Sequence, residues 1–105
     1  MPPVVRDLSI VLDKDAIDED LGDQVRQALC ADSEIVELVE IISETKYDDL
    51  PQKARVRLGI SKDQKNVLIR VVLRSLEKTL TSQECNDYRN QIYQALHKGS
   101  VEHLA

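Results

Sequence analysis

The sequence predicts a single α+β domain in which a four-stranded antiparallel sheet carries two helices on one face. Three observations lead to this fold class. Strand-like and helix-like segments alternate along the chain, the clearest strand is wholly apolar on only one side, and 105 residues suffice for one hydrophobic core. We therefore treat residues 1–105 as one domain.

The first three elements are indicated by a change of hydrophobic period. Residues 6–12, RDLSIVL, alternate in the manner of a strand. Residues 18–31 place apolar side chains at helical spacing and begin with three carboxylates, which favour the positive N-terminal end of a helix. Residues 35–44, IVELVEIISE, are rich in β-branched residues, which favours a half-exposed second strand.

The third strand is predicted over residues 65–76, where the two faces differ in character. The odd positions from Val67 to Leu73 are all apolar, whereas Arg70 and Arg74 lie on the opposite face. This pattern predicts one buried face and one basic face.

About twenty residues separate the second and third strands, which is too long for an unstructured hairpin loop. Pro51 at a first helical position, Ala54 and Leu58 four residues apart, and Gly59 as a left-handed stop predict a short inserted helix.

The last helix is predicted to begin at the capping box TSQE, residues 81–84, and to stop at Gly99. The tail at residues 100–105, SVEHLA, is expected to supply a short edge strand. The whole order is the split βαβ, or ferredoxin-like, arrangement, with one sheet face left open.

The sequence lacks the residues that several classes of function require. Cys30 and Cys85 show neither metal-binding nor redox spacing, and we expect both to be buried. His97 is expected only to complement a helix C-terminus, since no nucleophile, carboxylate pair or glycine-rich loop accompanies it. We expect no catalytic, metal or cofactor site. With no signal peptide and no apolar stretch of about 20 residues, we expect a cytoplasmic protein without a membrane partner.

The net charge of −5 conceals a strong segregation of charge. Residues 1–45 carry a net −9, whereas residues 46–78 carry a net +5. A basic segment attracts phosphates, although such runs more often mark solvated faces. Arg70 and Arg74 either contact RNA or pair across strands with Glu37 or Glu40. The third strand has no aromatic side chain for base stacking, so any RNA contact is expected mainly at phosphate and sugar.

Two segments at opposite ends of the chain carry a family likeness. PPVVRDLSIVLD, residues 2–13, resembles the P-x-V-x-R-D-L opening strand of the ferredoxin-fold anticodon-binding domain. This domain is the C-terminal domain of the beta subunit of bacterial phenylalanyl-tRNA synthetase and of the single-chain mitochondrial enzyme. LEKTLTSQECNDYRNQIYQAL, residues 76–96, resembles the family's R-T-L-T-x-x-E-V and final helix, with Lys78 in place of arginine and Cys85 in place of valine.

The resemblance implies a tRNA-binding module that reads the anticodon region of phenylalanine tRNA. The catalytic site, with its ATP and magnesium, would lie in another part of a phenylalanine-tRNA ligase, and the remainder of the synthetase would be a second partner. The residues expected to contact RNA are Arg6, Lys65, Arg70, Arg74 and Lys78.

Two other functions remain open from the sequence. One is an ACT-like amino-acid-binding regulatory module, although LDKDAID, residues 12–18, lacks the glycine-containing turn of that type. The other is a protein-interaction domain that docks its open sheet within a larger synthetase.

The connection at residues 46–64 is longer than the hairpin usual in the family, so the chain departs from the family pattern there.

Overall fold

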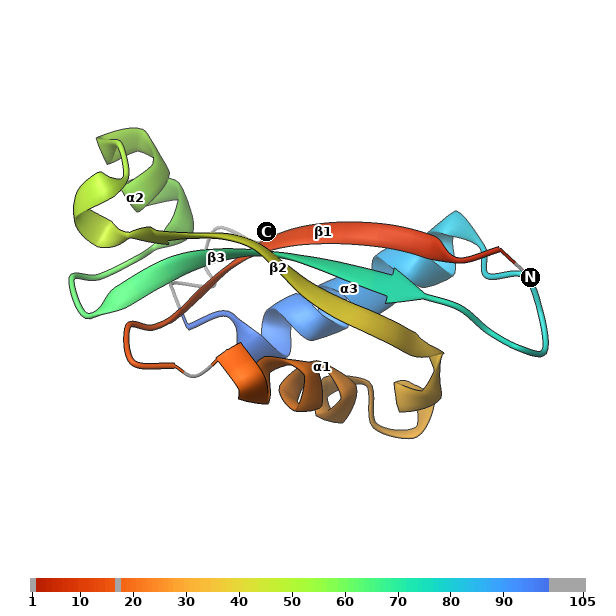
Figure 1. Ribbon diagram of the computed structural model, residues 1–105. Helices are drawn as coiled ribbons and strands as arrows, with labels where there is room; N and C mark the ends of the chain where they lie inside the picture. Colours follow the sequence, from red (N-terminus) through yellow and green to blue (C-terminus); the bar gives the residue numbers. More distant parts are fainter. Residues whose placement is uncertain (1, 17, 99–105) are drawn as a thin grey trace.

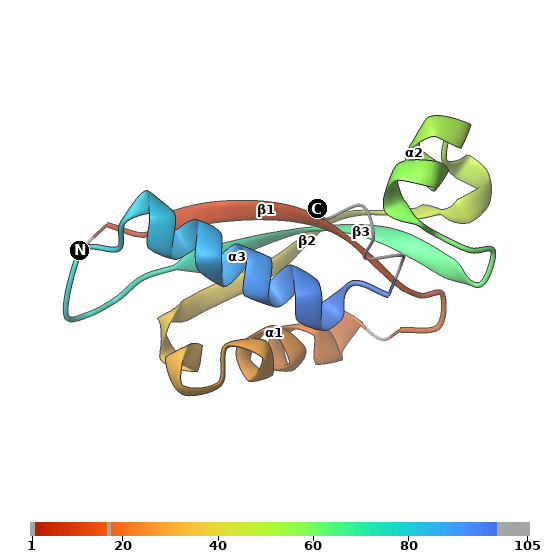
Figure 2. The same ribbon diagram turned by 180° about the vertical axis from the view of Figure 1, so that it is seen from behind.

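The computed structural model describes residues 2–16 and 18–98, and it confirms an α+β, ferredoxin-like arrangement (Figure 1). Helices α1 and α3 cover one face of an antiparallel sheet, and α2 stands at one end on the opposite side (Figures 1 and 2). The strands are β1 (Val4–Asp13), β2 (Val36–Lys46) and β3 (Gln64–Leu73), and the helices are α1 (Leu21–Leu29), α2 (Gln52–Leu58) and α3 (Ser82–Leu96). Short 3₁₀ turns occur at Asp18–Asp20, Cys30–Ile35 and Tyr47–Asp49.

The strand β3 lies in the middle of the sheet, whose order is β1-β3-β2 with antiparallel pairing on both sides. Ile69 pairs with Leu8 of β1 and Ile41 of β2, so these three side chains face α1 and α3. Val67, Ile69, Val71 and Leu73 are each at most 1% exposed. The predicted buried face of the third strand is therefore confirmed.

The main core fills the space between the sheet and the two long helices. Both helices present a stripe of apolar side chains to it, formed by Leu21, Val25 and Leu29 in α1 and by Cys85, Ile92 and Leu96 in α3. The helical spacing of these apolar residues explains why both segments form helices rather than strands.

A second, smaller core lies on the other side of the sheet and holds α2 in place. Val11 of β1 is fully buried there against Leu58 and Ile60, with Tyr47 and Leu50 packed around them. The inserted helix is thus confirmed. It ends as predicted at Gly59, whose φ of 64° is a left-handed conformation that glycine adopts without steric cost.

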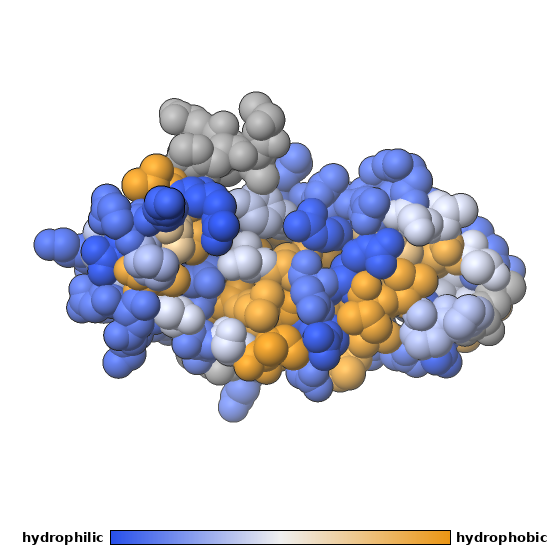
Figure 3. Space-filling view, turned by 90° about the horizontal axis from the view of Figure 1, so that it is seen from above, coloured by the Kyte–Doolittle hydropathy of each residue, from blue (hydrophilic) through white to orange (hydrophobic). Residues whose placement is uncertain are grey.

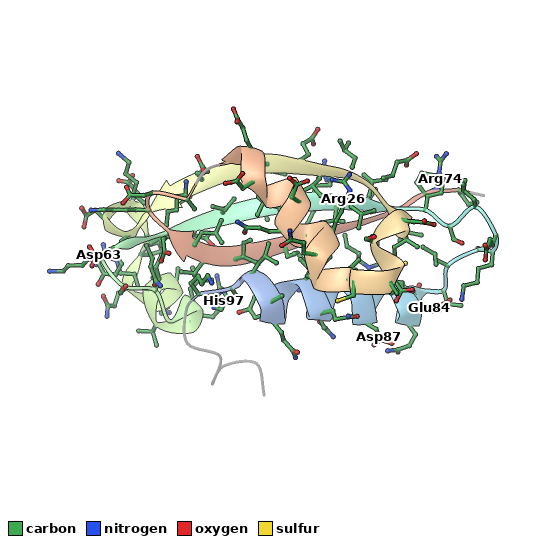
Figure 4. The ribbon with its side chains drawn as sticks, turned by 90° about the horizontal axis from the view of Figure 1, so that it is seen from below. Arg26, Asp63, Arg74, Glu84, Asp87 and His97 are labelled. Carbon is green, nitrogen blue, oxygen red and sulfur yellow. The ribbon has the colours of Figure 1, made fainter. Side chains whose placement is uncertain are left out.

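His97 joins these two cores, which the sequence did not indicate. The side chain is buried just after α3, at the end of the molecule where α2 lies (Figure 4). The Val11 amide donates to its Nδ1 at 3.0 Å, and its Nε2 lies 3.2 Å from the Leu58 carbonyl oxygen. The next amide, that of Lys98, donates to the Val11 carbonyl oxygen at 2.6 Å, which places the chain beside the outer edge of β1.

Some expectations differ from the structure or fall beyond it. The sheet has three strands among the described residues, and the fourth strand expected at residues 100–105 lies outside them. The first long helix, expected over residues 18–31, is shorter at both ends, because 3₁₀ turns at Asp18–Asp20 and Cys30–Ile35 flank α1. Cys85 is buried, and burial raises the pKa of its thiol, but Cys30 is exposed, so the expectation for Cys30 was wrong.

The capping box at the start of α3 is present in both directions. The Glu84 amide donates to Thr81 Oγ1 at 3.0 Å, and the Thr81 amide donates to Glu84 Oε1 at 3.1 Å. We expect Thr81→Ala to lower the free energy of unfolding by about 1 kcal/mol in urea titrations. Thr81→Ser, which keeps the hydroxyl, is the control and should remain near the parent value.

The same motif predicts a pH dependence. Lys78, and then the Thr81 amide, hold the pKa of Glu84 below its ordinary value of 4.5. A depressed folded pKa means that the unfolded chain takes up the proton first. The stabilisation by Glu84 should therefore be complete above about pH 4.5 and disappear as the pH falls below it. Glu84→Gln should remove this part of the acid dependence.

Candidate nucleic-acid interface

The sheet face opposite α1 and α3 is organised in rows that cross all three strands. Val5, Val72 and Leu38 form one row, in register across β1, β3 and β2. The next row is Asp7, Arg70 and Glu40. Apolar areas flank a hydrophilic band on this face (Figure 3). The open face therefore alternates apolar and charged surface.

Arg70 lies on the open face, as predicted, but it is paired. Its Nε donates to Asp7 Oδ1 at 2.9 Å and its Nη2 donates to Asp7 Oδ2 at 3.1 Å. This bidentate contact raises the pKa of Arg70, with a further contribution from Glu40, and lowers the pKa of Asp7. The cross-strand partner comes from β1 rather than from β2.

Arg74, just beyond β3, also faces a carboxylate. Its Nη1 lies 3.5 Å from Glu37 Oε1, as the cross-strand alternative predicted. With Asp7, Glu37 and Glu40 beside the two arginines, this group of charges sums to −1. The expectation of a positively charged open face was therefore wrong.

Lys65 and Arg6 lie on the helix side of the sheet, because their register positions alternate with those of the open face. Lys65 Nζ is 2.8 Å from Glu44 Oε1 and donates to the Ala16 carbonyl oxygen at 3.1 Å. Arg6 Nε donates to Asn86 Oδ1 of α3 at 3.1 Å. The structure therefore does not bring these two residues together with Arg70.

Lys78 lies in the loop before α3 and forms an ion pair with Glu84, the capping-box residue of that helix. The pair raises the pKa of Lys78. Four of the five residues predicted to contact RNA, namely Lys65, Arg70, Arg74 and Lys78, thus have a carboxylate partner within the domain.

A different set of basic residues lacks such partners. We define the α2 arm as residues 46–62, from the end of β2 through α2 to the loop that follows. Its five basic residues form no ion pair with a carboxylate among the described residues: Lys46, Lys53, Arg55, Arg57 and Lys62. These charges are evident in the sequence, but none of the five residues predicted to contact RNA lies in the arm.

The three tyrosines do not offer a stacking platform on the open face. Tyr47 carries the Arg55 guanidinium 4.2 Å above its ring, and Tyr93 stacks on His97. Tyr88 packs against the main core. Contact with RNA through this face would therefore depend on phosphate, sugar or base edges rather than on base stacking.

Within residues 2–16 and 18–98, no three metal-ligating side chains come together. None of the helices in these ranges has the length and apolar character that crossing a bilayer requires.

These features define a small binding module built on an exposed antiparallel sheet with an appended basic arm. The family model described as the ferredoxin-fold anticodon binding domain matches residues 1–102, and the chain belongs to this family. It is therefore an anticodon-binding domain, and tRNA binding follows from that membership. A comparison with curated proteins gave no match.

Proposed function

We propose that this domain recognises the anticodon region of phenylalanine tRNA as part of a phenylalanyl-tRNA synthetase or a synthetase-like protein. The observation that carries this proposal is the family match over residues 1–102. In this proposal the domain contributes to aminoacylation without holding the catalytic site. ATP and magnesium bind elsewhere in the parent enzyme, whose remaining domains or other subunit are the second partner, and the protein is cytoplasmic.

The two motifs that point to the synthetase family have clear structural roles, which supports their use as family markers. Thr81 caps α3, and Leu80 is only 7% exposed in the main core. Asp7 fixes Arg70 on the open face. These residues thus help to position the sheet and the last helix of this domain.

As RNA contacts, Arg6, Lys65, Arg70, Arg74 and Lys78 stay a prediction. For four of them a phosphate would have to replace a carboxylate that is already in place. Such an exchange gives less net free energy than binding by an unpaired cation, because one ion pair is lost for each one formed.

The test is a filter-binding titration of the 105-residue chain against a phenylalanine-tRNA transcript at two salt concentrations. A transcript with another anticodon on the same tRNA body is the matched control. We expect the exchange of anticodon to weaken binding by about tenfold or more, since each lost base contact costs about 1–3 kcal/mol. Equal affinity for both transcripts would contradict anticodon recognition.

A second candidate function is docking of the open face on another part of a synthetase. The observation that favours it is the apolar row at one end of this face, where Val5 is 47% exposed and Leu38 is 49% exposed. Leu76, in the loop after β3, is 90% exposed. The same titration separates the two functions, because a docking domain would not bind either transcript even at low salt.

A further inference from the structure

The basic third of the sequence divides into two parts in the structure. From residue 65 to residue 78, each of the four basic residues has a carboxylate partner. The α2 arm holds five basic and two acidic residues, a net charge of +3, while the other 88 residues of the chain sum to −8. The α2 arm thus carries a net positive charge on a projecting segment of an otherwise acidic domain (Figure 1).

The arm is anchored to the sheet by buried side chains, which defines where the backbone that carries its charges lies. Leu58 and Ile60 bury against Val11 of β1, as described above. Arg55 ties the arm together, because its Nε donates to the Tyr47 carbonyl oxygen at 3.0 Å and its Nη2 donates to the Asp48 carbonyl oxygen at 3.2 Å. Arg55 is therefore a structural residue of the arm.

The outer surface of α2 combines charge with exposure. Lys53, Val56 and Arg57 are exposed, and the first and last are four residues apart, which places them side by side on one face of the helix. Val56 is 57% exposed between them. Since Leu58 points into the small core and Arg55 toward Tyr47, this face is directed away from the domain.

We propose that Lys53 and Arg57 on the α2 arm contact the phosphate backbone of the bound RNA; this rests on the proposed function, in which tRNA is the ligand. No ion pair among the described residues has to be broken for either side chain to reach a phosphate. The arm stands on the same side of the sheet as the open face (Figures 1 and 2), so RNA lying along that face would meet it.

The proposal is tested with the double variant Lys53→Ala/Arg57→Ala in the full 105-residue chain. The matched control is Arg26→Ala/Arg89→Ala, which removes the same charge from α1 and α3 on the opposite side of the sheet (Figure 4 labels Arg26). Binding of the phenylalanine-tRNA transcript is measured from 50 mM to 1 M salt. Urea unfolding and circular dichroism of each variant establish that the fold is unchanged.

Each single-strand phosphate contact contributes about 0.7 to the slope of log affinity against log salt. The arm variant should therefore lose about 1.4 of slope, which corresponds to roughly 25-fold weaker binding at 0.1 M salt if the curves converge at 1 M. The control should keep the parental slope. This combination supports the proposal.

Three other outcomes overturn it, and they are distinguishable from one another. An arm variant with the parental slope leaves the proposed function standing and removes the phosphate contacts from α2. Equal losses in both double variants show that net charge, not the arm, governs binding. A parental chain that does not bind the transcript even at 50 mM salt ends both this inference and the proposed function.

Discussion

Ile69→Ala is expected to lower the free energy of unfolding by about 2–5 kcal/mol, because it leaves a cavity in the middle of the main core. Ile69 is fully buried in the central strand, between Leu8 on one side and Ile41 on the other. A loss of this size is a large fraction of the stability of a domain of about 100 residues. Urea denaturation followed by circular dichroism measures it.

Leu68→Ala is the matched control, one position earlier in the same strand. Leu68 is half-buried on the open face, opposite Ser9 and Ser43, so the same type of truncation should cost about 1 kcal/mol or less. If Leu68→Ala proved as costly as Ile69→Ala, the assignment of the two sheet faces would be wrong, since a shift of one residue in register exchanges them.

Much of this fold could be predicted because its signals are local. The period of two in β3 predicts that Ile69 and Arg70 lie on opposite faces of the sheet. The capping-box motif by itself identifies the two residues that bond to each other, Thr81 and Glu84. A capping box is complete within four residues. No knowledge of the rest of the chain is needed to read it.

The candidate site was less predictable because it depends on pairing between distant segments. The sequence showed that Arg70 would lie on the open face, but not that β1 would place Asp7 directly opposite. Strand order and register decide which carboxylate meets which arginine. Net charge counted along the chain does not distinguish Arg70, which is paired with a carboxylate, from Arg57, which has no such partner among the described residues. Only the structure makes that distinction.

Cys30 and His97 both differ from what the sequence led us to expect, for different reasons. Cys30 directly follows Leu29 and so lies off the apolar stripe of Leu21, Val25 and Leu29, and the chain turns there with a φ of 50°, which leaves the side chain outside the core. His97 is buried because α2 folds back over β1, and nothing in the residues around His97 indicates that contact. The exposure of Cys30 is a local outcome that its residue type alone did not indicate, whereas the burial of His97 follows from tertiary packing, which local periodicity does not encode.

His97 links the inserted helix to the sheet through two buried hydrogen bonds. Because the Val11 amide can only donate, Nδ1 of His97 must accept, and the neutral ring then carries its proton on Nε2. That proton is directed to the Leu58 carbonyl oxygen. The ring also stacks on Tyr93, with centroids 4.5 Å apart and an angle of 16° between the planes.

We expect His97→Ala to lower the free energy of unfolding by about 2–4 kcal/mol, because a buried donor and a buried acceptor both lose their partner. His97→Asn is the informative comparison, since its amide oxygen occupies nearly the position of Nδ1 but its side chain does not reach Leu58. The asparagine variant should therefore lose clearly less stability than the alanine variant in urea titrations. A stability of His97→Ala close to that of the parent chain would contradict the two buried bonds.

Hydrogen exchange locates the effect of His97→Asn within the fold. The amides of Gly59 and Ile60 donate to the Arg55 carbonyl oxygen at the end of α2, so their exchange reports how firmly this helix is held. In the asparagine variant these two amides should exchange faster, while the amide of Ile69 in the central strand keeps its protection. Uniform acceleration at all three positions would mean that His97 stabilises the whole domain rather than the attachment of α2. Selective acceleration would identify it as the residue that fixes the α2 arm, and with it the placement of Lys53 and Arg57.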